Sequence, residues 1–504
     1  MKIKIPGEVL KILKELLEQG FDSYIVGGCV RDILLKKNPK DWDIATQAKP
    51  EEIQKLFPES VYENQFGTVI VKTESNDPTL KTIEVTTFRK EGKYSDKRHP
   101  DFIGFAENIN EDLSRRDFTI NAIALKIEKE KITNLDFQVF EEKDFQIIDP
   151  FKGKEDLKKK LVRAVGDPNQ RFQEDALRLL RAIRFACELD FEIEKNTFLA
   201  IKNNSHLLKY IASERIRDEF LKIILSQKTS QGIILLKDSG LLKIFLPELE
   251  EGIGVTQNKH HIYTVFEHLI RSLDYAVQKN YSLEIRLASL FHDIGKPRTK
   301  EGEGPEATFY NHEIVSTKMT EKILKRLKIE KKVSQKILIL VRYHGFVYDP
   351  EITTDSAIRR LILKVGKENI FDLAKVREAD RIGSGCPKAK PFRLRHFLFK
   401  VEKILKEMSG EQISLKTLKV NGHDVMQVLN IKPSKKIGYI LNILLEEILD
   451  DPSKNNREFL LKEIQKLGQL SDKDLEKRQK KAQEKYKALL EKEEEILKRK
   501  HRVK

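Results

Sequence analysis

Residues 25–46 read IVGGCVRDILLKKNPKDWDIAT, and this stretch contains the first candidate motifs of the chain. The apolar residues 24–26 run directly into Gly27 and Gly28, which indicates a strand that ends in a turn before a helix. Such a turn leaves backbone N–H groups free to approach phosphate. Two glycines by themselves equally fit an ordinary tight turn, so their meaning depends on the residues that follow.

Two aspartates follow, in the sequence Asp41-Trp42-Asp43. Residues two apart in a strand point to the same face, so we expect the carboxylates of Asp41 and Asp43 to converge. Converging carboxylates repel unless a cation lies between them, and Mg²⁺ prefers such oxygen ligands together with substrate phosphates. Glu84, in the strand-like segment KTIEVTTFR, is either a third carboxylate of this site or a solvated strand residue. The pattern predicts a metal site for nucleotidyl transfer.

A basic and acidic cluster comes next, in residues 115–122, which read RRDFTINA. Arg115 and Arg116 could grip phosphate while Asp117 reaches a ribose hydroxyl. An ordinary ion-pair cluster would give the same sequence.

Residues 171–185 read RFQEDALRLLRAIRF, and their apolar spacing predicts one continuous helix. Asp175 and Arg178 would then be i, i+3 neighbours, and Arg181 and Arg184 would continue a basic stripe. An Asp offers acceptors and an Arg offers donors, so this pair could read the edge of a base. The alternative is a surface salt bridge.

These motifs, together with residues 149–157 (DPFKGKEDL), follow one another in an order that resembles a known family. Residues 20–225 are similar to the class II tRNA nucleotidyltransferases and bacterial poly(A) polymerases of the DNA polymerase beta superfamily. The resemblance implies that Asp41, Asp43 and Glu84 are catalytic, with Mg²⁺ on the two aspartates. It implies a nucleotide-binding set of Gly27, Gly28, Arg31, Arg116, Asp117, Asp175, Arg178, Arg181 and Arg184. Within this set, Asp175 and Arg178 would pair with the incoming CTP or ATP in place of a nucleic-acid template.

The resemblance also identifies residues 89–101 (RKEGKYSDKRHPD) as the flexible loop of that family, with Arg98 as its expected functional residue. The loop is complete, which favours addition of the full CCA sequence or of the terminal A to a tRNA 3′ end.

A second constellation occupies residues 268–380, where four of the chain's 11 histidines lie in or beside expected helices. The series consists of His268, His292, Asp293, His312, His344 and Asp380. It resembles the HD superfamily of metal-dependent phosphohydrolases, although any one of these histidines alone would more often be structural. Imidazole and carboxylate ligands suit a divalent metal such as Mn, Ni, Fe or Mg. Lys296 follows His292 and Asp293 closely in the sequence and could contact a phosphate bound at this site.

We therefore predict an α+β fold in which a nucleotidyltransferase palm with a small mixed sheet precedes an all-helical remainder. The predicted domains are the palm (1–150), a helical neck (151–250), an HD domain (251–400), a helical tRNA-binding body (401–470) and a charged helical or disordered tail (471–504). In the neck, the charges of residues 213–220 (SERIRDEF) should brace its helices.

Composition is consistent with an RNA partner. The 504 residues carry 94 Lys and Arg against 79 Asp and Glu, a net charge of +15 that suits a polyanion. No apolar run approaches the roughly 20 residues of a membrane helix, and three dispersed cysteines favour a reducing cytoplasm. The oligomeric state has no sequence signal.

Three other functions remain open at this stage. A poly(A) polymerase would share every catalytic residue named above. The HD domain could be the main activity, with an RNA-binding N-terminal half. A non-catalytic RNA-binding protein is disfavoured, because carboxylates in a phosphate-binding cleft weaken RNA binding unless a metal neutralises them.

Overall fold

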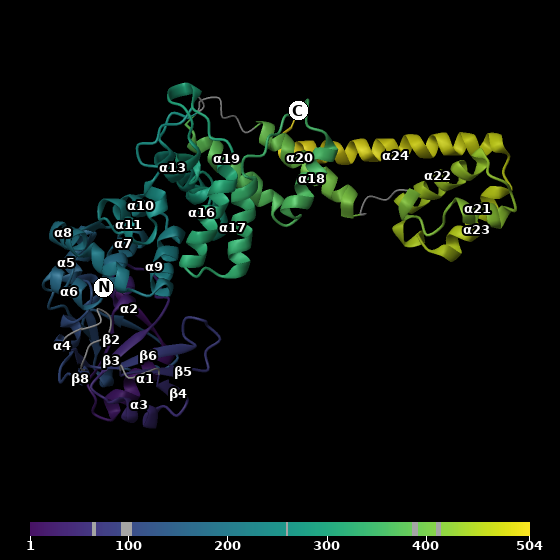
Figure 1. Cartoon of the computed structure of the whole chain (residues 1–504). Helices are drawn as coiled ribbons and strands as arrows, with labels where there is room; N and C mark the ends of the chain where they lie inside the picture. Colours follow the sequence, from purple (N-terminus) through teal and green to yellow (C-terminus); the bar gives the residue numbers. More distant parts are fainter. Residues whose placement is uncertain (63–66, 92–102, 259–260, 386–391, 410–414, 504) are drawn as a thin grey trace. The chain divides into compact units, whose positions relative to one another are not determined.

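The computed structural model describes all residues except 63–66, 92–102, 259–260, 386–391, 410–414 and 504 (Figure 1). Arg98 and most of its loop therefore lie outside the described residues. The chain forms two compact units: Met1–Arg342 with Ile382–Gly385, and Tyr343–Arg381 with Cys386–Lys504. Within the described residues, no helix combines the length and apolarity that a membrane crossing requires.

The first unit begins with a mixed seven-stranded sheet of order β11-β9-β2-β3-β6-β5-β4. Its strands are β2 (Ser23–Val26), β3 (Asp43–Thr46), β4 (Ser60–Tyr62), β5 (Thr68–Lys72), β6 (Thr82–Thr87), β9 (Ala124–Ile127) and β11 (Phe145–Ile148). Strands β3 and β6 pair in parallel with Asp43 opposite Glu84, whereas the neighbouring pairs are antiparallel. The predicted palm and its mixed sheet are confirmed.

Short elements surround this sheet. They are β1 (Lys2–Pro6), α1 (Gly7–Glu18), α2 (Gly28–Leu34), α3 (Pro50–Leu56), β7 (Arg89–Glu91), β8 (Ile103–Phe105), α4 (Ile109–Ser114), η1 (Thr119–Asn121), η2 (Lys129–Lys131) and β10 (Phe137–Glu141). Helix α1 buries Val9, Leu10 and Leu13, the face set by three- and four-residue spacing. This buried face of α1 packs against β1 and β2.

A helical region follows the palm. Its elements are α5 (Gly153–Lys159), β12 (Leu161–Val162), α6 (Pro168–Glu174), α7 (Leu177–Leu189), β13 (Glu192–Ile193), α8 (Lys195–Asn204), η3 (Ser205–Tyr210), α9 (Ser213–Leu225), α10 (Thr229–Asp238), α11 (Leu242–Phe245) and α12 (Pro247–Glu250). The expectation of one helix over residues 171–185 is wrong. Asp175 has extended backbone angles, φ −129° and ψ 108°, and its carboxylate accepts the Leu177 N–H at 3.0 Å. Asp175 thus starts a new helix instead of continuing the old one.

The rest of the first unit is helical as well. It contains α13 (Val265–Gln278), α14 (Leu283–Phe291), α15 (Lys296–Thr299), η4 (Gly304–Glu306), α16 (His312–Arg326) and most of α17 (Lys331–Tyr343). Thr264 and Glu267 form a capping box that fixes the start of α13. His268 lies in the first turns of this helix, so the capping box also fixes where the His268 backbone lies.

The second unit consists almost entirely of helices. These are α18 (Asp355–Val365), most of α19 (Ile370–Gly383), α20 (Phe392–Ser409), η5 (Leu415–Thr417), α21 (Gly422–Leu429), α22 (Lys435–Asp450), η6 (Pro452–Lys454), α23 (Arg457–Gly468) and α24 (Asp472–His501). Leu475 of α24 joins a core cluster with Ile440, Leu444 and Leu460. The charged C-terminal segment is therefore a 30-residue helix, which packs on this cluster at its start and, through Leu497, on Phe399 of α20 near its end.

Candidate active site and candidate metal centre

Three carboxylates lie on or just before the paired interior strands β3 and β6 of the palm sheet. Asp43 begins β3, its register partner on β6 is Glu84, and Asp41 lies in a bend just before the strand. The expectation that Asp41 belongs to the strand is therefore wrong, because β3 begins two residues later. Burial and the charge of Glu84 raise the pKa of Asp43 to about 7, with a further contribution from Asp41. Glu84 and Asp41 therefore both disfavour the charged form of Asp43, and a divalent cation bound there would relieve this repulsion.

Gly27 forms the wall beside this carboxylate cluster. Its φ of +79° is a left-handed value, and a Cβ there would lie 2.9 Å from Nη1 of Arg116 and 3.1 Å from Oδ2 of Asp43. Only glycine lets the β2–α2 turn approach both groups so closely. Gly28 opens α2, and Arg31 on the same helix donates to Oδ1 of Asn121 at 2.8 Å. The predicted phosphate-binding glycines thus lie against the predicted metal site.

The two arginines of the RRD motif share one acidic partner that sequence reasoning missed. Asp112 is fully buried and accepts from Arg115 at 2.7 Å and from Arg116 at 3.2 Å. Despite burial, which acts in the opposite direction, the two guanidiniums lower the pKa of Asp112 to about 2. The signal was present in the sequence, because Asp112 precedes them by three and four residues on α4. Asp112 therefore holds Arg116 beside the carboxylate cluster.

Asp117 is fixed from three directions. It accepts from Arg181 at 2.7 Å, from the Asn121 amide at 3.1 Å and from the Phe118 N–H at 2.8 Å. Burial alone would raise the pKa of Asp117, but Arg181 and then Arg178 lower it to about 2. Asp117 is thus an ionised acceptor, the form that a ribose hydroxyl requires as a partner.

Asp175 and Arg178, the predicted base-reading residues, each pair with another residue. Asp175 pairs with Arg215 of α9 at 2.9 Å, and Arg178 pairs with Glu174 at 2.6 Å. The alternative, a salt bridge between Asp175 and Arg178, does not form because the helix breaks at Asp175, which turns its carboxylate toward α9. Arg215 and Glu174 are the partners that the sequence reading missed, although Arg215 lies in the segment predicted to brace the neck.

Arg184, the last residue of the basic stripe, is buried and pairs with a residue of a neighbouring helix. Arg184 is 7% exposed and pairs with Glu219 of α9 at 3.2 Å, while its guanidinium lies 4.2 Å from the Phe185 ring centre. Its predicted role in nucleotide binding stays a prediction, and the geometry gives it a bracing contact. With the Arg215 pair, this contact shows that α9 does brace the neck.

The motif at residues 149–157 has a structural explanation. Asp149 caps α5 by accepting the backbone N–H groups of Gly153 and Lys154 at 2.7 and 2.8 Å. A Cβ at Gly153 would lie 2.1 Å from the Thr119 carbonyl oxygen. The glycine therefore lets α5 pack directly on the backbone of RRDFTINA.

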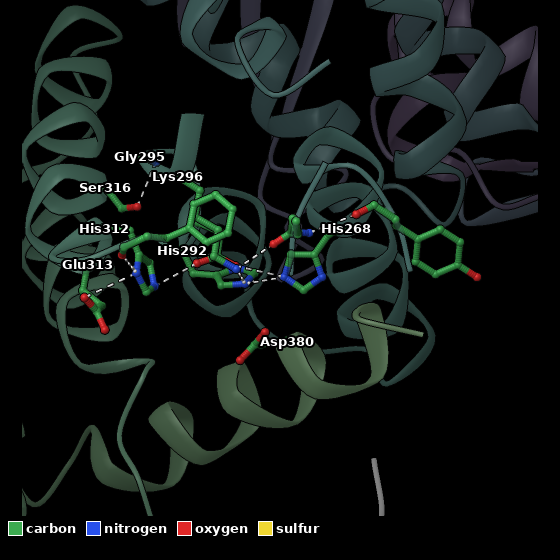
Figure 2. A network of polar contacts seen from close by, with 12 residues as sticks. His268, His292, Gly295, Lys296, His312, Glu313, Ser316 and Asp380 are labelled. Carbon is green, nitrogen blue, oxygen red and sulfur yellow. Dashed lines mark hydrogen bonds and ion pairs between the residues drawn. The ribbon is translucent and has the colours of Figure 1, made fainter. Parts of the chain in front are cut away.

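The structure also brings together four members of the histidine and aspartate series within the first unit. His268 and His292 have their Nε2 atoms 2.9 Å apart, and Asp293 Oδ2 lies 3.2 and 3.3 Å from these atoms. His312 approaches the other oxygen of Asp293 at 3.3 Å. Figure 2 shows the rings of His268, His292 and His312 pointing toward a common centre.

Hydrogen bonds fix the protons of two of these rings. His292 Nδ1 lies 2.9 Å from the Ser289 carbonyl oxygen, and His312 Nδ1 lies 2.8 Å from that of Phe309. A carbonyl only accepts, so each Nδ1 carries the proton and each Nε2 keeps a lone pair for a metal. The donor set of buried imidazoles and a carboxylate fits a divalent metal.

Lys296 forms an ion pair with Asp293, one of the predicted metal-binding residues, so its ammonium group is already paired in this structure. Its ammonium is buried and lies 2.6 Å from Asp293 and 2.7 Å from Oε1 of Gln257. Burial by itself raises the pKa of Asp293, but Lys296 and His292 outweigh it and hold that pKa well below the ordinary value. Asp293 is therefore ionised and available as a ligand.

The last two expected ligands belong to the second unit. His344 follows the end of α17, and Asp380 lies on α19, where it accepts from Arg377 at 2.6 Å. Their membership of the metal site remains a prediction.

Comparison with known proteins agrees with the palm and its helical extension. Residues 23–163 match the profile described as the Poly A polymerase head domain, and residues 307–464 match the tRNA nucleotidyltransferase domain 2. Residues 190–253 match the RNA and SrmB-binding site of polymerase A. Fold and site together define a nucleotidyltransferase of this head-domain class.

Individual relatives narrow the class to one family. The CCA-adding enzyme of Ligilactobacillus salivarius is 33% identical over 92% of this chain and 98% of its own length. The CCA-adding enzyme of Lactococcus lactis is 44% identical, over 49% of this chain and 58% of that enzyme. A solved CCA-adding enzyme from Bacillus stearothermophilus, in complex with CTP, matches 91% of this chain and 96% of its own with a TM-score of 0.54 and 26% identity. The chain belongs to the family of CCA-adding enzymes.

Proposed function

We propose that this protein adds CCA to the 3′ end of tRNA from CTP and ATP, without a nucleic-acid template. The observation that carries the proposal is the convergence of Asp41, Asp43 and Glu84 beside the Gly27 turn. The full-length match to a CCA-adding enzyme and the CTP bound by the Bacillus relative support the substrates. Two buried free thiols, Cys29 and Cys187, support a cytoplasmic location.

The chain's own residues have distinct tasks in this proposal. Asp41 and Asp43 would hold Mg²⁺, which when bound lowers the pKa of the attacking 3′-hydroxyl and neutralises the leaving pyrophosphate. The Gly27–Gly28 turn and Arg116 hold the triphosphate so that its α-phosphate lies in line with that hydroxyl. Ionised Asp117 accepts a hydrogen bond from the ribose. Asp175 and Arg178 present acceptors and donors to the base once the nucleotide replaces their present partners.

Extension of tRNA transcripts tests the proposal. Transcripts that end before CCA, after C and after CC are incubated with Mg²⁺ and CTP, ATP, UTP or GTP, singly and together. We expect completion to CCA and then arrest. Addition of a single A to the CC-ending transcript alone would indicate an A-adding enzyme, and long A tails a poly(A) polymerase.

A matched pair of variants locates the chemistry. Asp43→Ala should abolish addition while tRNA binding is kept, because the carboxylate is needed for the metal. Glu74→Ala removes an exposed carboxylate after β5 and should leave addition unchanged. If Asp43→Ala kept full activity, the carboxylate cluster would not be the active site.

A second activity is favoured by the histidine and aspartate cluster. We propose that His268, His292, Asp293 and His312 hold a divalent metal for phosphate-ester hydrolysis. The support is the geometry of these four groups and the lone pairs that the Nδ1 hydrogen bonds leave on the Nε2 atoms of His292 and His312. Hydrolysis of a 2′,3′-cyclic nucleotide, measured with Mn²⁺, Ni²⁺ or Mg²⁺ added, tests this activity separately from nucleotide addition. Addition without hydrolysis under all three metals would limit the cluster to a structural role.

A further inference from the structure

An aromatic pocket in the second unit has no role in the functions above. It encloses about 250 Å³ between the turn that follows α17, helix α18 and helix α20. Phe346 and Phe397 form its inner wall, with ring centres 4.7 Å apart. The volume is below the roughly 300–1,000 Å³ of sites for drug-sized ligands, so the pocket suits a single planar group.

Tyr348 and His396 support the aromatic wall of the pocket. Phe397 is 1% exposed, and Tyr348 packs edge-on against it at 5.2 Å between ring centres. The Tyr348 hydroxyl is in turn bonded to His396 Nδ1 at 2.5 Å. Phe346 is only half-buried, and the neighbouring Val347 is 86% exposed. The pocket therefore presents a partly exposed aromatic surface to solvent.

Positive charge lines the mouth of this pocket. Arg360 and Lys364 are exposed, lie one helical turn apart on α18 and both belong to the lining. Their neighbours on the helix are neutralised, because Arg359 pairs with Glu407 at 2.6 Å and Asp355 with Lys400 at 3.1 Å. Within the part of the chain that the structure describes, the side chains of Arg360 and Lys364 form no ion pair or hydrogen bond. Two cations are therefore available to an anionic partner.

We propose that this pocket binds one unpaired base of an RNA, with Arg360 and Lys364 on the adjacent phosphates. An aromatic wall stacks on any base, and two cations one turn apart suit consecutive phosphates of a strand. The charge complementarity favours RNA over a second protein, whose apolar contact would leave both cations in an apolar interface. The inference deepens the proposed function, since it names where the second unit contacts the tRNA.

Binding of a tRNA transcript that ends before CCA, measured by fluorescence anisotropy with the full-length protein, tests the pocket. Base stacking contributes about 1–3 kcal/mol, so Phe346→Ala should weaken binding by about five- to 150-fold. The double variant R360E/K364E should weaken it further and reduce the slope of log Kd against log salt by about 1 to 2. Lys11→Glu, an exposed lysine on α1 of the palm, is the control for charge and should change binding less than twofold.

The outcomes separate this inference from the proposed function. If the wild-type protein extends no transcript, the proposed function is overturned. The comparison of tRNA binding between the pocket variants and the Lys11→Glu control would still test whether the pocket binds RNA. Wild-type protein that extends tRNA, with pocket variants that bind it like the Lys11 control, would overturn the inference. If Phe346→Ala fails to fold, the surface double variant decides alone. Variants that change the mass of the protein in solution while tRNA binding stays constant would assign the pocket to a protein contact, and would also overturn the inference.

Discussion

Replacement of Gly27 by alanine is the sharpest test of how the palm positions its carboxylates. The added Cβ would lie 2.9 Å from Arg116 Nη1 and 3.1 Å from Asp43 Oδ2, where an ordinary contact is 3.4–4 Å. One or both groups must therefore move by several tenths of an ångström, up to about 1 Å. A misplacement of about 1 Å in an active site can cost about 100-fold in rate. We expect kcat for nucleotide addition to fall about 10- to 100-fold, or about 1.4–2.7 kcal/mol in activation free energy.

Stability changes must be separated from this effect, because Gly27 has a φ of +79° and any side chain there is strained by about 1–3 kcal/mol. Gly20 offers the control: its φ is +85°, but a Cβ there meets nothing within 4 Å. Gly20→Ala should lower the thermal midpoint comparably and leave kcat within about twofold. Single-turnover addition to a CC-ending transcript, with thermal unfolding in parallel, measures both. Equal activity losses in the two variants, or full activity in Gly27→Ala, would refute the reasoning.

Three further predictions follow from the sites. Burial and Glu84 raise the pKa of Asp43 to about 7, above the value near 3.9 of the unfolded chain, so the folded state gains a proton and its stability falls as pH rises from about 4 to 7. Asp43→Asn should therefore stabilise the metal-free protein at pH 8 but not at pH 4 in denaturant unfolding, and equal effects at both pH values would contradict the shift. Asp175→Ala should raise misincorporation of UTP or GTP by about tenfold, since a base-edge contact is worth about 1–3 kcal/mol, and unchanged fidelity would exclude base reading. His292→Ala should lower the divalent metal per chain, measured by elemental analysis, and keep nucleotide addition within about twofold; unchanged metal content would argue against the centre.

Features that depend on local chemistry could be predicted from the residues alone. The Gly27 turn, a strand in the segment KTIEVTTFR and the order of the palm motifs follow from residue type and short-range spacing, and the structure has the turn and the strand, β6 (Thr82–Thr87). The histidine and aspartate series was also visible, because chemically distinctive residues recur at helix ends. Local patterns predict such features because backbone angles and face periodicity are set within a few residues.

The pairing of charges could not be predicted from the sequence, because it depends on how separate helices pack. Asp175 pairs with Arg215, which is 40 residues further along, and Arg184 with Glu219, which is 35 further along. Local spacing on an unbroken helix offered only Arg178 as a neighbour of Asp175. Only the packing of α9 against α7 brings these partners together, and spacing along one helix contains no information about a second helix.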